Sequence, residues 1–177
     1  MIKLKDLLPN EDLVLYSNLS VEEVMRRIKE NVGPKVRSNY WNRPISCKSY
    51  EGDVYGNIFD IKKVIDYRNS FLPVIHGIVY LDANGKTGII LKMRLAPFVK
   101  AFILLWLLFT GLACIGFLIK GIINYNNILK GIGKIFEHGV PVPFFLFLFG
   151  CAITVIPFKI ESRKSIDFFK VLLRANV

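Results

Sequence analysis

Two long stretches without charge dominate the pattern of hydrophobic and polar positions along the chain. Residues 101–119 and 139–158 contain no Asp, Glu, Lys or Arg, and twelve residues of the first stretch are Leu, Ile or Phe. At about 1.5 Å per residue, the first stretch as a helix extends about 28 Å, close to the roughly 30 Å hydrocarbon core of a bilayer. Those twelve side chains favour insertion by about 4–7 kcal/mol. The pattern therefore predicts a transmembrane hairpin with spans 101–119 and 139–158. The residues expected to anchor it in the membrane are Lys100, Trp106, Lys120 and Lys159.

The basic residues near the two spans are unequally distributed. The connector, residues 120–138, has three of them: Lys120, Lys130 and Lys134. The segments before the first span and after the second have nine: Lys86, Lys92, Arg94, Lys100, Lys159, Arg163, Lys164, Lys170 and Arg174. Because cytoplasmic segments are the more basic ones, this predicts a multi-pass protein of the cell inner (plasma) membrane with both termini cytoplasmic.

The connector has apolar residues at helical spacing. Its apolar positions are Ile128, Leu129, Ile132, Ile135 and Phe136. They predict either a short amphipathic helix on the outer membrane surface or an extension of the first span.

A soluble helix is predicted ahead of the spans. Ser20 with Glu23 forms a capping box, apolar residues follow at helical spacing, and Gly33-Pro34 ends the run. The period then changes to that of strands at residues 46–51, 53–63, 73–82 and 86–95. Asn84-Gly85 marks a tight turn between the last two strands. Gly52, Gly56 and Gly77 favour a strongly curved sheet or a partial barrel.

The tail, residues 159–177, has a helical stripe formed by Ile166, Phe169, Leu172 and Leu173, which requires a surface to cover. The cytoplasmic sheet is the nearest surface, and the membrane is the alternative. The predicted fold is an α+β membrane protein: a small curved antiparallel sheet in the cytoplasm, flanking amphipathic helices, and a two-helix transmembrane hairpin. The domains are residues 1–100, 101–158 and 159–177, with the tail helix packed on the sheet.

Composition and charge exclude several classes of protein. The chain of 177 residues is 53% hydrophobic and 13% aromatic, which excludes an ordinary soluble globule and a disordered chain. Its formal net charge of +10 is explained by basic residues flanking the spans, so no nucleic-acid partner is expected. Cys47, Cys114 and Cys151 have no metal-ligand spacing, and no metal or cofactor is expected. No catalytic motif is present, so no enzyme is expected.

One polar loop is a candidate ligand site. Arg68, Asn69 and Ser70 lie just before the strand that carries His76, and together these four residues could bind a ligand. The alternative is that Asn69-Ser70 is a structural turn and His76 a structural histidine.

Several segments resemble a family of small bacterial two-span membrane proteins. The resemblance is carried by Tyr50-Glu51-Gly52, Phe59-Asp60-Ile61, Tyr67-Arg68-Asn69-Ser70-Phe71-Leu72-Pro73, Gly77 and Met93-Arg94-Leu95-Ala96-Pro97-Phe98. It covers about half the chain and implies a bacterial inner-membrane setting. The family is uncharacterised, so the resemblance implies no catalytic residues.

Three hypotheses for function follow. The first is a membrane-tethered binding or sensing module, whose partners are the lipid bilayer and a protein or small molecule on the cytoplasmic face. The second is an effector of bacterial-defence type that forms homo-oligomers and perturbs the membrane when triggered through its cytoplasmic domain. The third is an interfacial enzyme, which would require Arg68, His76 and Asp60 in one pocket.

Overall fold

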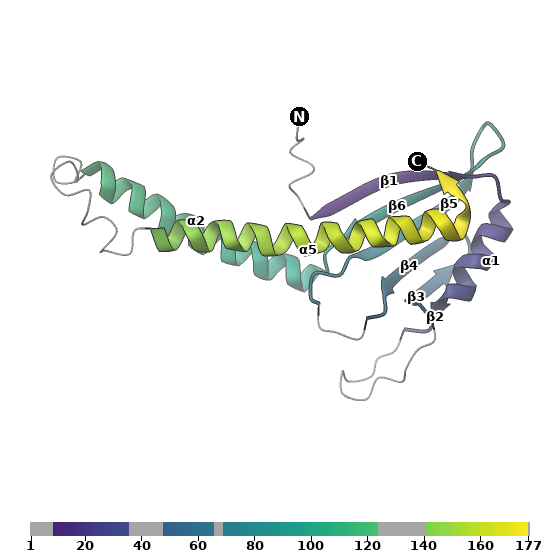
Figure 1. Cartoon of the computed structure of the whole chain (residues 1–177), viewed down its shortest axis with the longest axis horizontal. Helices are drawn as coiled ribbons and strands as arrows, with labels where there is room; N and C mark the ends of the chain where they lie inside the picture. The colour runs from purple at the N-terminus through teal and green to yellow at the C-terminus, as the bar shows by residue number, and fades with distance from the viewer. Residues whose placement is uncertain (1–8, 36–47, 66–68, 124–140, 177) are drawn as a thin grey trace. The chain divides into compact units, whose positions relative to one another are not determined.

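The computed structural model describes residues 9–35, 48–65, 69–123 and 141–176. Within these residues the chain is an α+β protein with three helices and one sheet of seven strands (Figure 1). It divides into two compact units. One consists of Met1–Ala96 with Pro157–Val177, and the other of Pro97–Ile156. The first is called here the β unit and the second the apolar unit.

The sheet of the β unit has the strand order β2-β3-β4-β5-β6-β1-β7. The strands are β1 (Asn10–Ser17), β2 (Val32–Gly33), β3 (Tyr50–Tyr55), β4 (Ile58–Lys63), β5 (Val74–Leu81), β6 (Thr87–Arg94) and β7 (Ala175–Asn176). All neighbours are antiparallel except β2 and β3, which are parallel. The prediction of a purely antiparallel sheet is therefore wrong at this edge. The reason is that helix α1 (Val21–Asn31) carries the chain from one side of the sheet to the other before β2 forms.

One face of the sheet forms the core. Residues of this inner face alternate with outward residues along each strand, as Ile89, Leu91 and Met93 do along β6, and all three are fully buried. The final part of α5 (Pro141–Leu173) covers this face, with the rings of Phe59 and Phe169 6.0 Å apart. Phe169 and Leu173 are fully buried, so the last part of α5 packs on the sheet.

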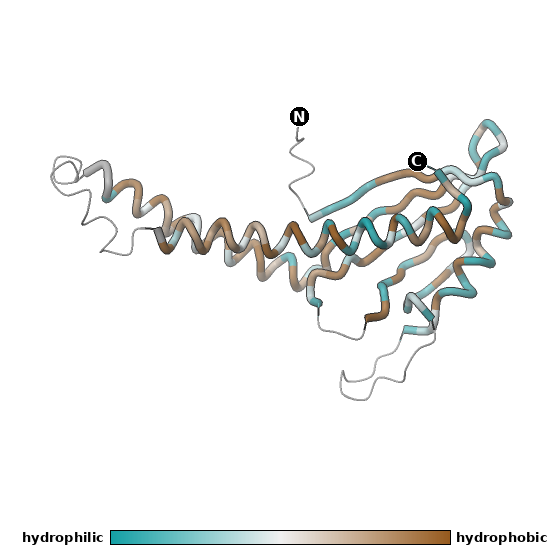
Figure 2. Tube along the Cα trace, viewed as in Figure 1, coloured by the Kyte–Doolittle hydropathy of each residue, from teal (hydrophilic) through white to brown (hydrophobic). Residues whose placement is uncertain are grey.

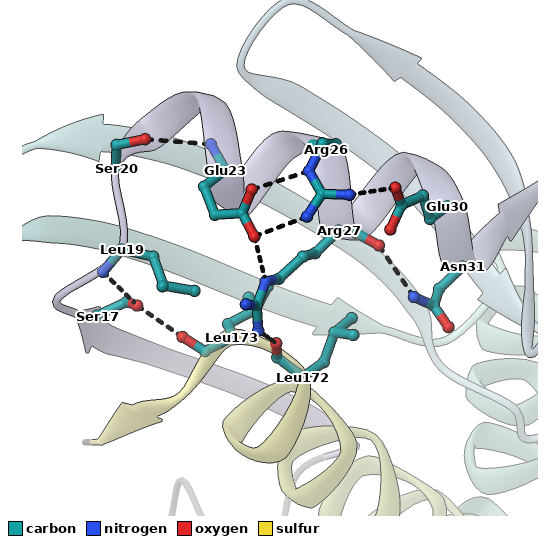
Figure 3. A network of polar contacts seen from close by, with 10 residues as sticks. All are labelled: Ser17, Leu19, Ser20, Glu23, Arg26, Arg27, Glu30, Asn31, Leu172 and Leu173. Atoms are coloured by element: carbon teal, nitrogen blue, oxygen red, sulfur yellow. Dashed lines mark hydrogen bonds and ion pairs between the residues drawn. The ribbon is translucent and has the colours of Figure 1, made fainter.

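Helix α1 begins as its sequence predicts. Ser20 is the N-cap and its side chain accepts a hydrogen bond from the Glu23 N–H. Glu23 in turn binds the guanidinium groups of Arg26 and Arg27, whose hydrogen bonds lower the pKa of Glu23 to about 2. Arg27 also donates to the Leu172 carbonyl at 2.9 Å, which joins α1 to the last turn of α5 (Figure 3).

The end of α5 is fixed to the sheet as well. The Ser17 hydroxyl donates to the Leu173 carbonyl at 2.6 Å, and two residues later Ala175 pairs with Ser17 to form β7 (Figure 3). Since a helix leaves its last carbonyls without partners in the helix, Ser17 and Arg27 satisfy two of them.

Helix α5 runs without a break from the apolar unit into the β unit. The sequence instead predicts a span ending at residue 158 and a separate tail helix, and the structure differs here. Pro157 lies inside the helix, where its missing N–H removes one backbone hydrogen bond. Fully buried Phe158 and the hydrogen bonds of Lys159 to Glu11 and to the Asn10 carbonyl hold the residues that follow, so the helix continues.

The apolar unit contains α2 (Pro97–Ile123) and the first part of α5. Hydrophobic residues cover both helices over most of their length here (Figure 2). The two helices are close at Gly150, where an added Cβ would lie 2.7 Å from Trp106 Nε1. Helix α2 includes the predicted span 101–119 and begins four residues earlier. The predicted connector helix falls on residues 124–138, which lie outside the described residues.

Two further differences concern strands. Strand β1 is not among the predicted strands, although it pairs with the whole of β6. The predicted strand at 53–63 is a hairpin of β3 and β4, in which Gly56 turns the chain with a φ of 52°.

Candidate functional site

The outer face of the sheet is the candidate functional surface. No described helix is packed against it, because α1 and the end of α5 bury their apolar residues on the inner face. The strand registers place its side chains in rows that cross β1, β6, β5, β4 and β3. Two rows matter for chemistry, one apolar and one polar.

The apolar row is unusual for a surface open to water. It consists of Val14, Ile90, Ile78, Ile58 and Tyr55, each opposite the next across neighbouring strands. Ile58 is 41% exposed and Tyr55 66% exposed.

Two tyrosines extend this row toward the β5–β6 turn. Tyr80 lies on Gly88, where an added Cβ would be 2.4 Å from its ring, and Tyr16 lies opposite Gly88 on β1. Partial burial raises the pKa of Tyr80, and the Tyr16 hydroxyl acts in the same direction. A contiguous apolar surface of this kind is typical of an interaction site.

The polar row lies next to the apolar one and consists of Asp12, Lys92, His76, Asp60 and Asp53. His76 Nδ1 and Asp60 Oδ1 are 2.6 Å apart, with the two side chains 42% and 53% exposed. Asp12 forms an ion pair with Arg94 at 2.7 Å. Lys92 has no ion pair within the part of the chain that the structure describes. The row therefore has an unpaired positive charge on β6 and acidic groups on β4 and β3.

The predicted ligand residues lie at two separate places. Asn69 accepts a hydrogen bond from the Phe71 N–H at 3.0 Å, the geometry of a structural turn, and Ser70 is exposed beside it. His76 lies on the outer sheet face with Asp60 as its partner. Arg68 lies outside the described residues. Of the residues predicted to anchor the chain in a membrane, Lys100 and Lys120 are exposed on α2, and Trp106 packs on Gly150.

As a site residue, Asp60 was named only in the hypothesis of an interfacial enzyme, and it was not predicted to be the partner of His76. Asp60 is sixteen residues away, so no local spacing joins the two. The signal that could find it is the register of successive antiparallel strands, which places Asp60 opposite His76. The pair lies on an open surface and not in a pocket, and the described residues bring no three metal-ligating side chains together.

A second polar group lies on the inner face, between the sheet and α5. The Glu161 carboxylate is 3.1 Å from Lys63 Nζ and 2.7 Å from Lys164 Nζ, and its side chain is 4% exposed. Burial acts to raise its pKa, but the hydrogen bonds and charges of the two lysines outweigh burial, so the pKa of Glu161 is lowered. The ion pair with Lys63 fixes α5 to β4, and the Glu161 carboxylate is closed to solvent, so this group is structural.

Three buried hydroxyls lie beside this carboxylate. Among the residues that the structure describes, the side chains of Tyr50, Ser162 and Ser165 have no hydrogen-bond partner of normal geometry. Burial raises the pKa of Tyr50 to about 12, and the nearby Ser165 hydroxyl opposes this shift without overcoming it. Such unsatisfied groups weaken a core.

Comparison of the chain with protein-family models, with curated proteins and with solved structures finds no match. The functional conclusion therefore depends on the two units and on the outer face of the sheet.

Proposed function

We propose that the chain is an inner-membrane protein in which α2 and the first part of α5 cross the lipid bilayer, while the β unit is a cytoplasmic binding or sensing module. The single observation that carries the proposal is the exposure of the two apolar helices. Both are long and apolar enough to cross a membrane, and only 6% and 17% of their most apolar windows are buried. Phe102, Leu105 and Phe109 are each more than half exposed on α2.

The exposure matters because the helices have no protein to cover them within the described residues. A core helix of a soluble protein with the same composition would be mostly buried. Exposing a large apolar side chain to water costs about 1.5–3 kcal/mol, whereas acyl chains solvate it. Lipid is therefore the solvent that fits these surfaces.

The orientation rests on charge. Nine basic residues flank the two spans on the side of the β unit, against three in residues 120–138. By the positive-inside rule, the β unit is cytoplasmic.

The outer sheet face supports the binding role. Its apolar row lies beside a polar row in which Lys92 has no ion pair with another described residue, and protein interfaces use this combination of apolar contact and charged rim. We expect this face to bind a protein partner on the cytoplasmic side.

The test of membrane insertion and topology uses the full chain in a bacterial cell. We expect the protein to remain in the pellet after alkaline carbonate extraction, a C-terminal green fluorescent protein to fluoresce, and alkaline phosphatase inserted at Lys130 to be active. Release of the chain into the carbonate supernatant would disprove the insertion. Alkaline phosphatase activity at the C-terminus would disprove the orientation.

A further inference from the structure

We infer that the partner of the outer sheet face is a second copy of this chain, joined face to face with its β5 against the first copy's β5. The inference rests on the proposed function, in which this face is the binding surface. It follows from the way in which the face complements itself under a two-fold rotation.

The rotation axis is fixed by the rows. Two sheets that pack face to face keep their strands within about 30° of each other and lie about 10 Å apart. A rotation about an axis across the strands, through the apolar row, would place the polar row against Tyr16 and Tyr80. A rotation about an axis parallel to β5 instead keeps each row against itself. Both operations keep the apolar row against an apolar row, but only the second also keeps the polar row against a polar row.

The apolar contacts under this rotation are well matched. β5 is the middle of the five strands that carry the face, so Ile78 meets Ile78 of the second copy. Ile90 on β6 meets Ile58 on β4, and Val14 on β1 meets Tyr55 on β3. The association would bury the exposed parts of Ile58 and Tyr55.

One charged contact of the polar row is complementary in the same arrangement. Lys92 on β6 lies opposite Asp60 on β4 of the second copy, and the contact occurs twice in the pair. Within one chain His76 lies between these two residues, so Lys92 and Asp60 are two strands, about 10 Å, apart. Lys92, which has no ion pair within the described residues, thus gains an acidic partner. Asp12 lies opposite Asp53, but Arg94 already neutralises Asp12.

The first test is a crosslink at the axis. In a background with Cys47→Ser, Cys114→Ala and Cys151→Ala, we expect Ile78→Cys to form a crosslinked dimer with a short bismaleimide in isolated membranes. The control is Asp167→Cys, an exposed position on α5, which covers the other face. A dimer yield from Ile78→Cys no higher than that from Asp167→Cys would overturn the inference.

The second test reverses the charges. On the Ile78→Cys background, Lys92→Glu alone places two acidic groups together, and Asp60→Lys alone places two basic groups together. Each should lower the dimer yield by about tenfold or more, because like charges across an interface cost several kcal/mol. When the two variants are expressed together with different tags, the acidic group at position 92 faces the basic group at position 60, and both contacts between positions 92 and 60 are attractive. We expect the mixed dimer to return to the yield of the parent.

Each remaining outcome has a distinct meaning. A mixture that crosslinks no better than either variant alone would overturn the inference. Crosslinking of Ile78→Cys to a different protein would also overturn it, while leaving the proposed function in place. Loss of the chain from the membrane pellet would refute the proposed insertion whatever the crosslinks show. Lys92 and Asp60, the two positions of the charge variants, are both exposed. An unchanged thermal unfolding midpoint of each charge variant confirms that the β unit is folded.

Discussion

The indole of Trp106 lies directly against Gly150, so that a Cβ added to this glycine would be 2.7 Å from Nε1 and 2.8 Å from Cδ1. Gly150 is buried, and Trp106 contacts it through the body of its ring and not through a flexible end. The glycine therefore sets how closely α2 and α5 approach at this level. Small residues allow this kind of close helix contact in membranes.

Gly150→Ala should destabilise the helix pair by about 1–3 kcal/mol, since the two helices must move apart or the indole must turn. The measurement is the thermal unfolding midpoint of the purified protein in detergent. The matched control is Gly116→Ala on α2, where an added Cβ meets nothing within 4 Å. An equal midpoint for the two variants would contradict the packing described for Trp106.

Gly77→Ala should destabilise the β unit. The ring of Phe59, which is fully buried, lies on Gly77, and an added Cβ would be 1.9 Å from its Cζ. The expected loss in the free energy of unfolding is about 1–3 kcal/mol. It can be measured by urea unfolding followed by far-ultraviolet circular dichroism. The double variant Gly77→Ala with Phe59→Leu should lose less than the sum of the two single variants, because the smaller side chain leaves room for the methyl group. Strict additivity would argue against the contact.

Glu161→Gln should lower the free energy of unfolding by about 1–3 kcal/mol at neutral pH, because two charge-assisted hydrogen bonds to Lys63 and Lys164 are weakened at a buried site. The control is Glu30→Gln, which removes an exposed pair with Arg26 and should change stability by less than about 0.5 kcal/mol.

The same variant has a defined pH dependence. The pKa of Glu161 is lower in the folded protein than its ordinary value of 4.5. Its contribution to stability is therefore fully present above pH 4.5 and is lost as the pH falls through the lower, folded-state pKa. The difference between the parent and Glu161→Gln should shrink between pH 7 and pH 3, and a constant difference would contradict the ion-paired state.

Tyr50→Phe should leave stability at pH 7 unchanged or raise it by up to about 1 kcal/mol, because the buried hydroxyl has no hydrogen bond of normal geometry to another described residue. The folded-state pKa of Tyr50 is raised from 10.0 to about 12. A raised pKa means that the parent keeps its stability below pH 10 and loses part of it as the pH rises toward 12. Between pH 9 and pH 12, the thermal unfolding midpoint of Tyr50→Phe should rise relative to that of the parent. The midpoint of Tyr55→Phe, at an exposed position, should not.

Local patterns in the sequence predicted the elements whose signals are local. Ser20 and Glu23 form the expected cap of α1, and Ile89, Leu91 and Met93 are buried as their alternation predicts. The apolar runs correctly predicted two helices long enough to cross a membrane.

Elements defined by distant partners were not predicted. Strand β1 has apolar residues at Leu13, Val14 and Leu15 in succession, so its alternation is masked, and only its pairing with β6 defines it. The continuous helix α5 was broken at Pro157 in the prediction, because proline is unfavourable inside a helix in isolation. Contacts of Phe158 and Lys159 with the β unit outweigh that preference, and no local pattern encodes them.

The candidate site was likewise predicted only where its signal is local. His76 was singled out from its position in the sequence, but its partner Asp60 and the rows of the outer face depend on strand register. The burial of Glu161, Ser162 and Ser165 was not predicted, because polar residues on a buried helix face interrupt the periodic pattern of hydrophobic residues.

The β unit is assembled from two segments separated by the apolar hairpin, and this dictates an order of events during synthesis. A ribosome delivers residues 1–96 before it makes Phe158, Phe169 and Leu173, the side chains that cover the sheet. Until the hairpin has been synthesised, α1 is the one described helix that can cover the inner face. Under the proposed membrane insertion, the nascent sheet is covered only after the hairpin has been inserted, so a failure to insert should leave its hydrophobic face exposed to chaperones or proteases.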